Sequence, residues 1–195
     1  MRYNPEHKQK TYDKVLKEAM LAIRKNGSDI GIPKLMSKVG LTHGGFYAHF
    51  KSKEDLINVA IEKMFLDRME MLKECLNTDD ALSGLENYID KYLSEKHRTH
   101  PELGCPAAAL ITEISRMPAS TQLVFEQGMD LLLLELSNAI KQLSTTSNPA
   151  ELATILLTEM IGCMTFARVI QNEERAKQVL ATTRHHLKTM LQQLS

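Results

Sequence analysis

Apolar residues recur at helical spacing along almost the whole chain. Between 8 and 25, for example, Tyr12, Val15, Ala19 and Ile23 are three or four residues apart, as on one face of an α-helix. The same pattern predicts further helices over 32–39, 42–50, 53–76, 79–96, 105–117, 120–143, 150–170 and 174–194, with a loop over 97–104 and a polar linker over 144–149. No strand-like alternation or internal repeat interrupts it. The predicted fold class is all-α, with about nine helices.

The stretch 40–53 places a turn, a very short helix and the start of the next helix within fourteen residues. Gly40 stands where a helix ending at Val39 needs a left-handed residue, which glycine adopts without steric cost. Thr42 is placed to cap the short helix, and Ser52 to cap the long helix that follows. We therefore expect a compact helical corner here.

The short helix has two different faces. Phe46 and Phe50 lie four residues apart and predict a buried face. The other face carries glycines, which each cost about 1 kcal/mol relative to alanine in a helix, so a bare backbone there is useful for close approach to a duplex. Small residues, donors and flanking lysines suit base edges and phosphates. The alternative is a tight corner with incidental lysines. The predicted DNA contacts are Thr42, His43, Gly44, Gly45, Tyr47, Ala48, His49, Lys51 and Lys53.

The run 32–56, IPKLMSKVGLTHGGFYAHFKSKEDL, resembles the DNA-binding signature of the tetracycline-repressor (TetR/AcrR) family of bacterial transcription regulators. The resemblance covers about the first 60 residues, and the remainder agrees only in length and helical character. Gly31 departs from the pattern, because members often carry Ser or Thr there to cap the helix before the turn. The resemblance implies a three-helix helix-turn-helix domain over 1–53, a linking helix over 53–76, and a regulatory and dimerisation domain over 54–195.

Charge is unevenly distributed although the formal net charge is zero. Residues 1–53 contain 11 Lys and Arg against 4 Asp and Glu, and the remainder contains 13 against 20. A basic head on an acidic body is expected of a nucleic-acid-binding module joined to another domain. Three cysteines without paired spacing indicate a reducing cytoplasm. No signal peptide is apparent, and the leucine run over 131–134 is too short to cross a bilayer. We expect a soluble cytoplasmic protein with no membrane partner.

The last two predicted helices carry apolar positions together with small residues that allow close approach. The resemblance implies that they pair with their symmetry mates in a four-helix dimer bundle, whereas the alternative is ordinary packing inside one chain. One short recognition helix reads few base pairs, so two heads on a two-fold axis would read a palindrome. We expect a homodimer on palindromic double-stranded DNA. The predicted interface residues are Leu152, Ile155, Leu156, Val179, Leu187, Met190 and Leu191.

Cys105 is the residue of the second domain most open to a chemical role. It precedes Pro106, a favourable first helical residue, so its sulfur is expected at a helix N-terminus, where a thiolate is stabilised. Basic side chains nearby that can strengthen this effect are His97, Arg98 and His100. Gly104-Cys105 before a small-residue helix also resembles a stretch of some redox- or electrophile-responsive family members. The alternative is a small residue that fills a crowded cap position.

A ligand pocket is implied by the family resemblance. An unknown small-molecule effector, apolar or electrophilic, would lie among the helices between 53 and 170, where adaptable methionines are frequent. The alternative is that these methionines simply fill a helical core. Besides Cys105, the residues expected to line the pocket are Phe65, Met69, Tyr88, Tyr92, Phe125, Met160 and Met164.

The sequence offers little for catalysis. It has no phosphate-cradling glycine loop and no metal-spaced ligand set, and Cys105 with His97 or His100 is the only candidate dyad. We therefore predict no enzyme activity, cofactor or metal. The predicted function is a DNA-binding regulator, by family default a repressor, released by an effector. The alternatives are a thiol-based sensor acting through Cys105 with no reversible ligand, and a helical interaction module, which would have no need of the basic head.

Overall fold

Residues 5–143 and 148–194 are described by a computed structural model of the chain. Within these ranges it contains nine α-helices, two 3₁₀ segments and no strand, so the predicted all-α class is confirmed. Most of the predicted linker over 144–149 lies outside the described residues.

The N-terminal head consists of α1 (Pro5–Asn26), α2 (Ile32–Lys38) and the 3₁₀ segment η1 (His43–Ala48). Gly27 ends α1 with a φ of +66° and Gly40 follows α2 with a φ of +76°, the left-handed conformation predicted for Gly40. The Lys14 amine donates a hydrogen bond to the carbonyl oxygen of Val39 at 3.0 Å, which fastens the C-terminal end of α2 to α1. This contact holds α2 and the turn that leads to η1 against α1.

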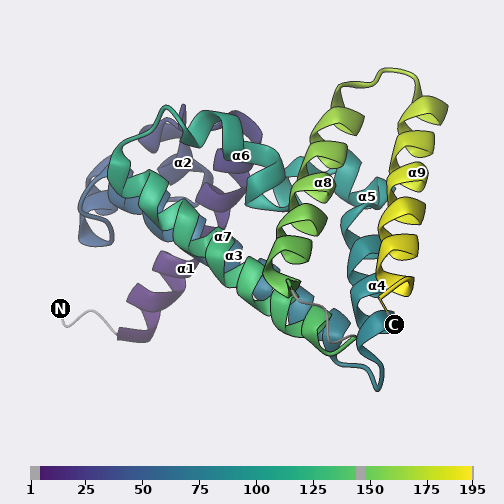
Figure 1. The fold of residues 1–195 in the computed structure, drawn as a ribbon. Helices are drawn as coiled ribbons and strands as arrows, with labels where there is room; N and C mark the ends of the chain where they lie inside the picture. Colours follow the sequence, from purple (N-terminus) through teal and green to yellow (C-terminus); the bar gives the residue numbers. More distant parts are fainter. Residues whose placement is uncertain (1–4, 144–147, 195) are drawn as a thin grey trace.

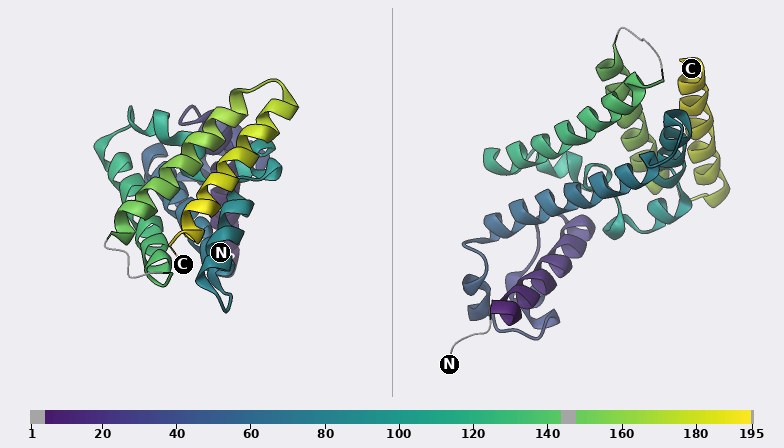
Figure 2. Two further views of the ribbon diagram at one scale, coloured as in Figure 1. Left: turned by 45° about the vertical axis from the view of Figure 1, so that its right-hand side comes forward. Right: turned by 90° about the horizontal axis from the view of Figure 1, so that it is seen from below.

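Helix α3 (Lys53–Leu76) has the predicted bounds and begins at the predicted cap. The Asp55 amide donates to the Ser52 hydroxyl oxygen at 3.0 Å. The first part of α3 packs on α1, and the helix also packs on α4 (Ala81–Tyr92) and α7 (Ala119–Lys141). The head lies at one end of α3 and the C-terminal helices lie at the other (Figure 2). A single continuous helix therefore joins the head to the body.

The rest of the body is built from short segments and a long helical pair. The short segments are α5 (Glu95–Thr99), η2 (Pro101–Leu103) and α6 (Pro106–Ile114), and the pair is α8 (Pro149–Val169) and α9 (Glu173–Gln192). Helix α8 packs on α7 and on α9, and α9 also packs on α4. The pair α8 and α9 stands at one edge of the molecule (Figure 1).

The structure corrects two sequence expectations in the body. The predicted helix over 79–96 breaks at Leu93, and the predicted loop over 97–104 is partly helical. The reason is local, because the Ser94 hydroxyl accepts a hydrogen bond from the His97 amide at 3.3 Å and so starts α5. Helix α7 is not fully enclosed, since Leu123, Leu131 and Leu134 remain exposed on it.

One described helix, α8, is long and apolar enough to cross a membrane by length and composition alone, although no membrane span is predicted from the sequence. In the structure 44% of its most apolar window is buried inside the protein. Packing on α7 and α9 accounts for those side chains, and a core helix meets the same length and composition criteria.

Candidate nucleic-acid interface

The short segment η1 is anchored by Phe46, which belongs to it, and by Phe50, which follows it. Phe46 is 1% exposed and Phe50 is 2% exposed, and their rings stack with centroids 5.5 Å apart. Phe50 also stacks on Tyr12 of α1 at 4.9 Å. The segment is a 3₁₀ helix rather than an α-helix, a form used in short pieces. The predicted buried face is therefore present and rests on α1.

The opposite side of η1 faces solvent. Tyr47 is 64% exposed, and its ring meets the edge of Phe46 at 5.2 Å and lies 5.9 Å from His43. His43, Gly44 and Ala48 are exposed as well. A Cβ atom built on Gly44 would find no neighbouring atom within 4 Å. An aromatic hydroxyl, an imidazole and bare backbone thus lie together on one open surface.

Two of the predicted contact residues are turned away from this surface. An added Cβ on Gly45 would come within 3.8 Å of the Met36 side chain, so this glycine faces α2. His49 is partly buried, and its ring lies 6.5 Å from that of Tyr12 on α1. Burial, with a smaller effect from Lys8, lowers the pKa of His49, which favours the neutral imidazole. His49 therefore lies at the flank of the surface.

The two helical segments that begin at this surface, η1 and α3, are capped in different ways. Thr42 precedes η1, but its hydroxyl makes no capping hydrogen bond, contrary to expectation. The turn is instead closed by the backbone, because the Gly45 amide donates to the Thr42 carbonyl at 3.0 Å. At α3, the Asp55 carboxylate accepts from the Lys51 amide at 2.8 Å. Lys51 and Lys53 are both exposed at this N-terminus, which is a favourable place for a phosphate.

Polar contacts fasten the head to the body at several points. Both the amide and the hydroxyl of Ser28 donate to the Glu113 carboxylate on α6, at 2.6 and 2.7 Å. Arg24 of α1 donates to the carbonyl of Glu102 in η2 at 3.3 Å. Near the start of α3, Asn58 accepts from the Thr121 hydroxyl of α7 at 2.7 Å. No local sequence signal predicts these pairs, because their partners are 63 to 85 residues apart.

Cys105 lies at the N-terminus of α6 immediately before Pro106, as expected, but its side chain is fully buried. Its amide donates to His97 Nε2 at 2.9 Å. Since Nε2 is the acceptor, His97 Nδ1 carries the proton and donates to the Tyr92 carbonyl at 2.6 Å. Burial lowers the pKa of His97 to about 4, so the ring is neutral at neutral pH.

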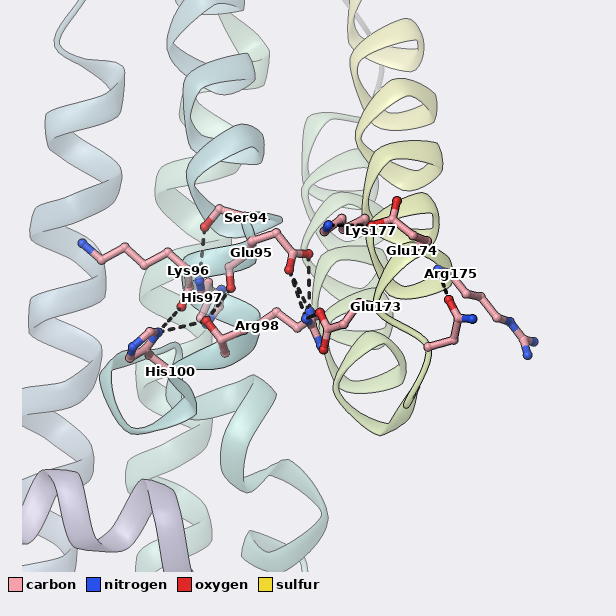
Figure 3. Close-up of polar contacts among 12 residues, drawn as sticks. Ser94, Glu95, Lys96, His97, Arg98, His100, Glu173, Glu174, Arg175 and Lys177 are labelled. Carbon is pink, nitrogen blue, oxygen red and sulfur yellow. Dashed lines mark hydrogen bonds and ion pairs between the residues drawn. The ribbon is translucent and has the colours of Figure 1, made fainter.

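Two of the basic residues expected around the Cys105 thiol, Arg98 and His100, are occupied elsewhere. Arg98 is paired with Glu95 and with Glu173 at the start of α9, on the side away from His100 (Figure 3). His100 Nδ1 lies near the Lys96 carbonyl and the Thr99 hydroxyl. Two arginines from other helices, Arg24 of α1 and Arg168 of α8, lie close enough to interact electrostatically with Cys105. Neither is near Cys105 in the sequence.

The residues expected to line an apolar pocket separate into two groups. Tyr88, Tyr92, Met160 and Met164 are completely buried in the core. Phe65 and Met69 instead border an apolar groove of about 460 Å³ between α3 and α7. Phe125 packs edge-on against Phe65, with centroids 5.1 Å apart.

The residues expected at the dimer interface also separate. Leu156, Leu187 and Leu191 are completely buried in the chain's own core, so their side chains do not face a second copy. Leu152, Val179 and Met190 are partly buried, and Ile155 is exposed. The outward face of α8 is defined by Ile155, Thr158, Gly162, Thr165, Phe166 and Val169.

The candidate catalytic dyad is not formed in this structure. His97 directs Nε2 to the backbone amide of Cys105, so this nitrogen is not placed to take a proton from the thiol. Among residues 5–143 and 148–194, no three His, Cys, Asp or Glu side chains come together as metal ligands would.

No protein-family model matches the chain. The chain is 30% identical over 98 residues to the uncharacterized HTH-type transcriptional regulator YvdT of Bacillus subtilis, which is 48% of this chain and only half (50%) of that protein. It is 21% identical over 182 residues to the HTH-type transcriptional repressor NemR of Escherichia coli, which is 87% of this chain and 89% of NemR.

Solved structures resemble the chain over nearly its full length. A TetR transcriptional regulator from Chloroflexus aurantiacus superposes with a TM-score of 0.84 at 20% identity, over 96% of this chain and 97% of that one. This chain has the TetR fold. Reduced NemR of E. coli shares this TetR fold, with a TM-score of 0.80 at 19% identity over 92% of this chain and 96% of that one. The resemblance identified in residues 32–56 is confirmed by these TetR-fold neighbours.

Proposed function

We propose that this protein is a cytoplasmic, homodimeric transcriptional regulator that represses from a palindromic operator and is released by a small effector. The observation that carries the proposal is the exposed surface of His43, Gly44, Tyr47 and Ala48, which the buried Phe46 and Phe50 hold on a TetR fold. The names of the similar proteins, which are helix-turn-helix transcriptional regulators, support it.

The residues of this surface have different roles in the proposed complex. His43, Gly44 and Ala48 face base edges in the major groove, where donors and small side chains read sequence. Tyr47 and Lys53 contact phosphates, which position the head without reading sequence. The exposed N-terminus of α3 adds backbone N–H groups to the phosphate contact.

Two substitutions test these roles by fluorescence anisotropy with DNA from the region flanking the gene. Lys53→Ala should weaken binding to all sequences alike and reduce the slope of affinity against salt, because one phosphate contact is lost. His43→Ala should lose about 1–3 kcal/mol on the cognate site only. Lys73→Ala, at the far end of α3, is the matched control. If His43→Ala weakened all sequences equally, η1 would be wrongly oriented in the proposal.

The outward face of α8 is the proposed dimer interface. A Cβ atom on Gly162 would meet nothing within 4 Å, so a second helix can approach closely there. Phe166 and Val169 are exposed at 51% and 69%, and their burial would favour association. Sedimentation at micromolar concentration should show a dimer. A monomer that still binds operator DNA tightly would contradict this part of the proposal.

The proposed release acts through α3. This helix packs on α1 in the head and on α4 and α7 in the body. A rearrangement among the body helices would therefore swing the head and change the separation of the two recognition surfaces in the dimer.

Thiol sensing through Cys105 is a second candidate mechanism of release. Its position at the N-terminus of α6 supports it, as does the solved relative described as a reduced form. The complete burial of Cys105 requires a local opening before a reagent can reach the sulfur. Cys105→Ser should keep DNA binding but abolish release by thiol-reactive compounds, with Cys75→Ser as the control. Unchanged release in Cys105→Ser would exclude the mechanism.

A further inference from the structure

A small basic pocket lies where α3, α4, α5 and η2 meet. Its volume is about 270 Å³, and its lining contains no Asp or Glu side chain. Lysine, arginine and histidine dominate the lining, and two apolar side chains complete one wall. The lining includes the cationic Arg68, Lys91 and Lys96 and the apolar Met71 and Leu103. The volume is near the lower end for ligand sites, so a small ligand is indicated.

Arg68 is held only weakly in this pocket. Its guanidinium donates to the Met71 sulfur at 3.3 Å and to the Leu103 carbonyl at 3.4 Å. Both hydrogen bonds are weak, because a thioether sulfur is a weak acceptor and the bond to the carbonyl is long. Its Nε is buried and has no hydrogen-bond partner among the described residues. A buried guanidinium donor without a partner is unfavourable, so an added acceptor would stabilise it.

Arg68 shares this region with two other arginines, Arg24 and Arg168. Arg24 donates to the Glu102 carbonyl, and Arg168 donates to the carbonyls of Ala108 and His97 at 2.8 and 2.9 Å. None of the three arginines forms an ion pair within the described part of the chain. Carbonyl oxygens satisfy N–H groups but carry no full charge. Burial, and then the charge of Arg68, lowers the pKa of Arg24 to about 10, at which it remains cationic at neutral pH.

The pocket supplies further donors and few acceptors. The amine of Lys96 extends away from α5 and contacts none of the other residues drawn in Figure 3. Lys91 is only loosely neutralised, since its amine lies 3.5 Å from Glu74. The hydroxyl of Tyr88 on α4, which interacts with the charge of Arg68, is buried without a hydrogen-bond partner among the described residues. This arrangement favours a ligand that only accepts hydrogen bonds and carries negative charge.

We propose that this pocket binds a small organic carboxylate as an effector, with the carboxylate on Arg68 and Lys96 and the apolar part on Met71 and Leu103. The planar guanidinium fork matches the two oxygens of a carboxylate, which a bare ammonium does not. Binding of the carboxylate to the pocket is independent of the proposed regulatory function. The role of the carboxylate as an effector rests on that function.

The position of the pocket explains how such a ligand would reach the head. Arg68 belongs to the linking helix α3, and it contacts the carbonyl of Leu103 in η2. The neighbouring η2 residue Glu102 holds Arg24 of the head helix α1. A carboxylate that takes Arg68 away from Leu103 would therefore disturb the segment that fastens α1 to the body.

Binding is tested on the full-length protein by thermal unfolding at constant ionic strength. The probes are benzoate, acetate, inorganic phosphate and the neutral benzamide. Benzoate at ten times its dissociation constant should raise the melting temperature by about 3–6 °C. Acetate and phosphate should act more weakly, because neither has an apolar part for Met71 and Leu103, and the uncharged benzamide should have no effect. Absence of a shift with either carboxylate, or a shift with phosphate alone, would overturn the proposal.

Variants locate the site. Arg68→Met should weaken benzoate binding about tenfold or more, because a charge-assisted hydrogen bond is lost. Lys96→Met should weaken it about two- to fivefold, as expected for an exposed ion pair, and being on the surface it should fold normally. Lys73→Met removes a charge from the same helix outside the pocket and should bind as the wild type does. Equal shifts in all four proteins would overturn the assignment.

A DNA-binding measurement separates this inference from the proposed function. Benzoate should release wild-type protein from its DNA but should not release Arg68→Met. A protein that binds benzoate and DNA independently would refute the effector role. A protein that binds no DNA even without benzoate would refute the proposed function, and the thermal shifts would still decide whether the carboxylate site exists.

Discussion

Acid should destabilise the protein through one buried imidazole, that of His97. The ring is 7% exposed, accepts from the Cys105 amide and donates to the Tyr92 carbonyl. Burial lowers its pKa from 6.5 to about 4. Between these two values the unfolded chain takes up a proton on His97 and the folded chain does not. Stability is therefore fully present above the unfolded pKa and is lost as the pH falls through this window.

The magnitude follows from the two pKa values. A pKa difference of 1.0 corresponds to about 1.4 kcal/mol. Protonation of His97 in the unfolded chain therefore lowers the free energy of unfolding by about 2 kcal/mol between about pH 7.5 and about pH 5. The loss approaches about 3 kcal/mol near about pH 4, where the folded ring also begins to protonate. This is a large fraction of the stability of an ordinary domain.

Urea unfolding at fixed protein concentration measures this loss. Unfolding is monitored by far-ultraviolet circular dichroism, because the chain has no tryptophan. Other groups also titrate, so the informative quantity is the difference between wild type and His97→Gln, whose amide oxygen can still accept from the Cys105 amide. The variant should lose about 2 kcal/mol less than the wild type on acidification to about pH 5. His100→Gln, at an exposed position nearby, should behave as the wild type does. An equal loss in His97→Gln and the wild type would refute the reasoning.

Further substitutions test local features of the structure. Ser52→Ala should cost about 0.5–2 kcal/mol of unfolding free energy, because the cap of α3 is lost, and urea titration measures it. Phe46→Ala should cost about 3–5 kcal/mol and weaken DNA binding in anisotropy, since it removes the anchor of η1. Tyr88→Phe should leave the unfolding free energy unchanged or raised, and a loss above about 1 kcal/mol would mean that its hydroxyl is bonded. Gly162→Arg should yield a folded monomer in sedimentation, and a stable dimer would exclude the α8 face as the interface.

Local features of this protein were determined by the sequence alone. Gly40 predicted the left-handed turn, Ser52 the start of α3, and the pair Phe46 and Phe50 the buried face of η1. Each of these depends on residues within one or two helical turns. The cap predicted at Thr42 failed because a 3₁₀ turn closes with its own backbone.

The arrangement of the body was decided only by the tertiary structure. Periodicity marks Leu156, Leu187 and Leu191 as apolar, but it does not say whether they pack on their own chain or on a second copy, and they pack on their own chain. Arg24 and Arg68 come close to each other from α1 and α3, although nothing near either in the sequence indicates it. Helical spacing specifies which face of a helix is apolar, whereas its partner is chosen by the packing of all the helices together.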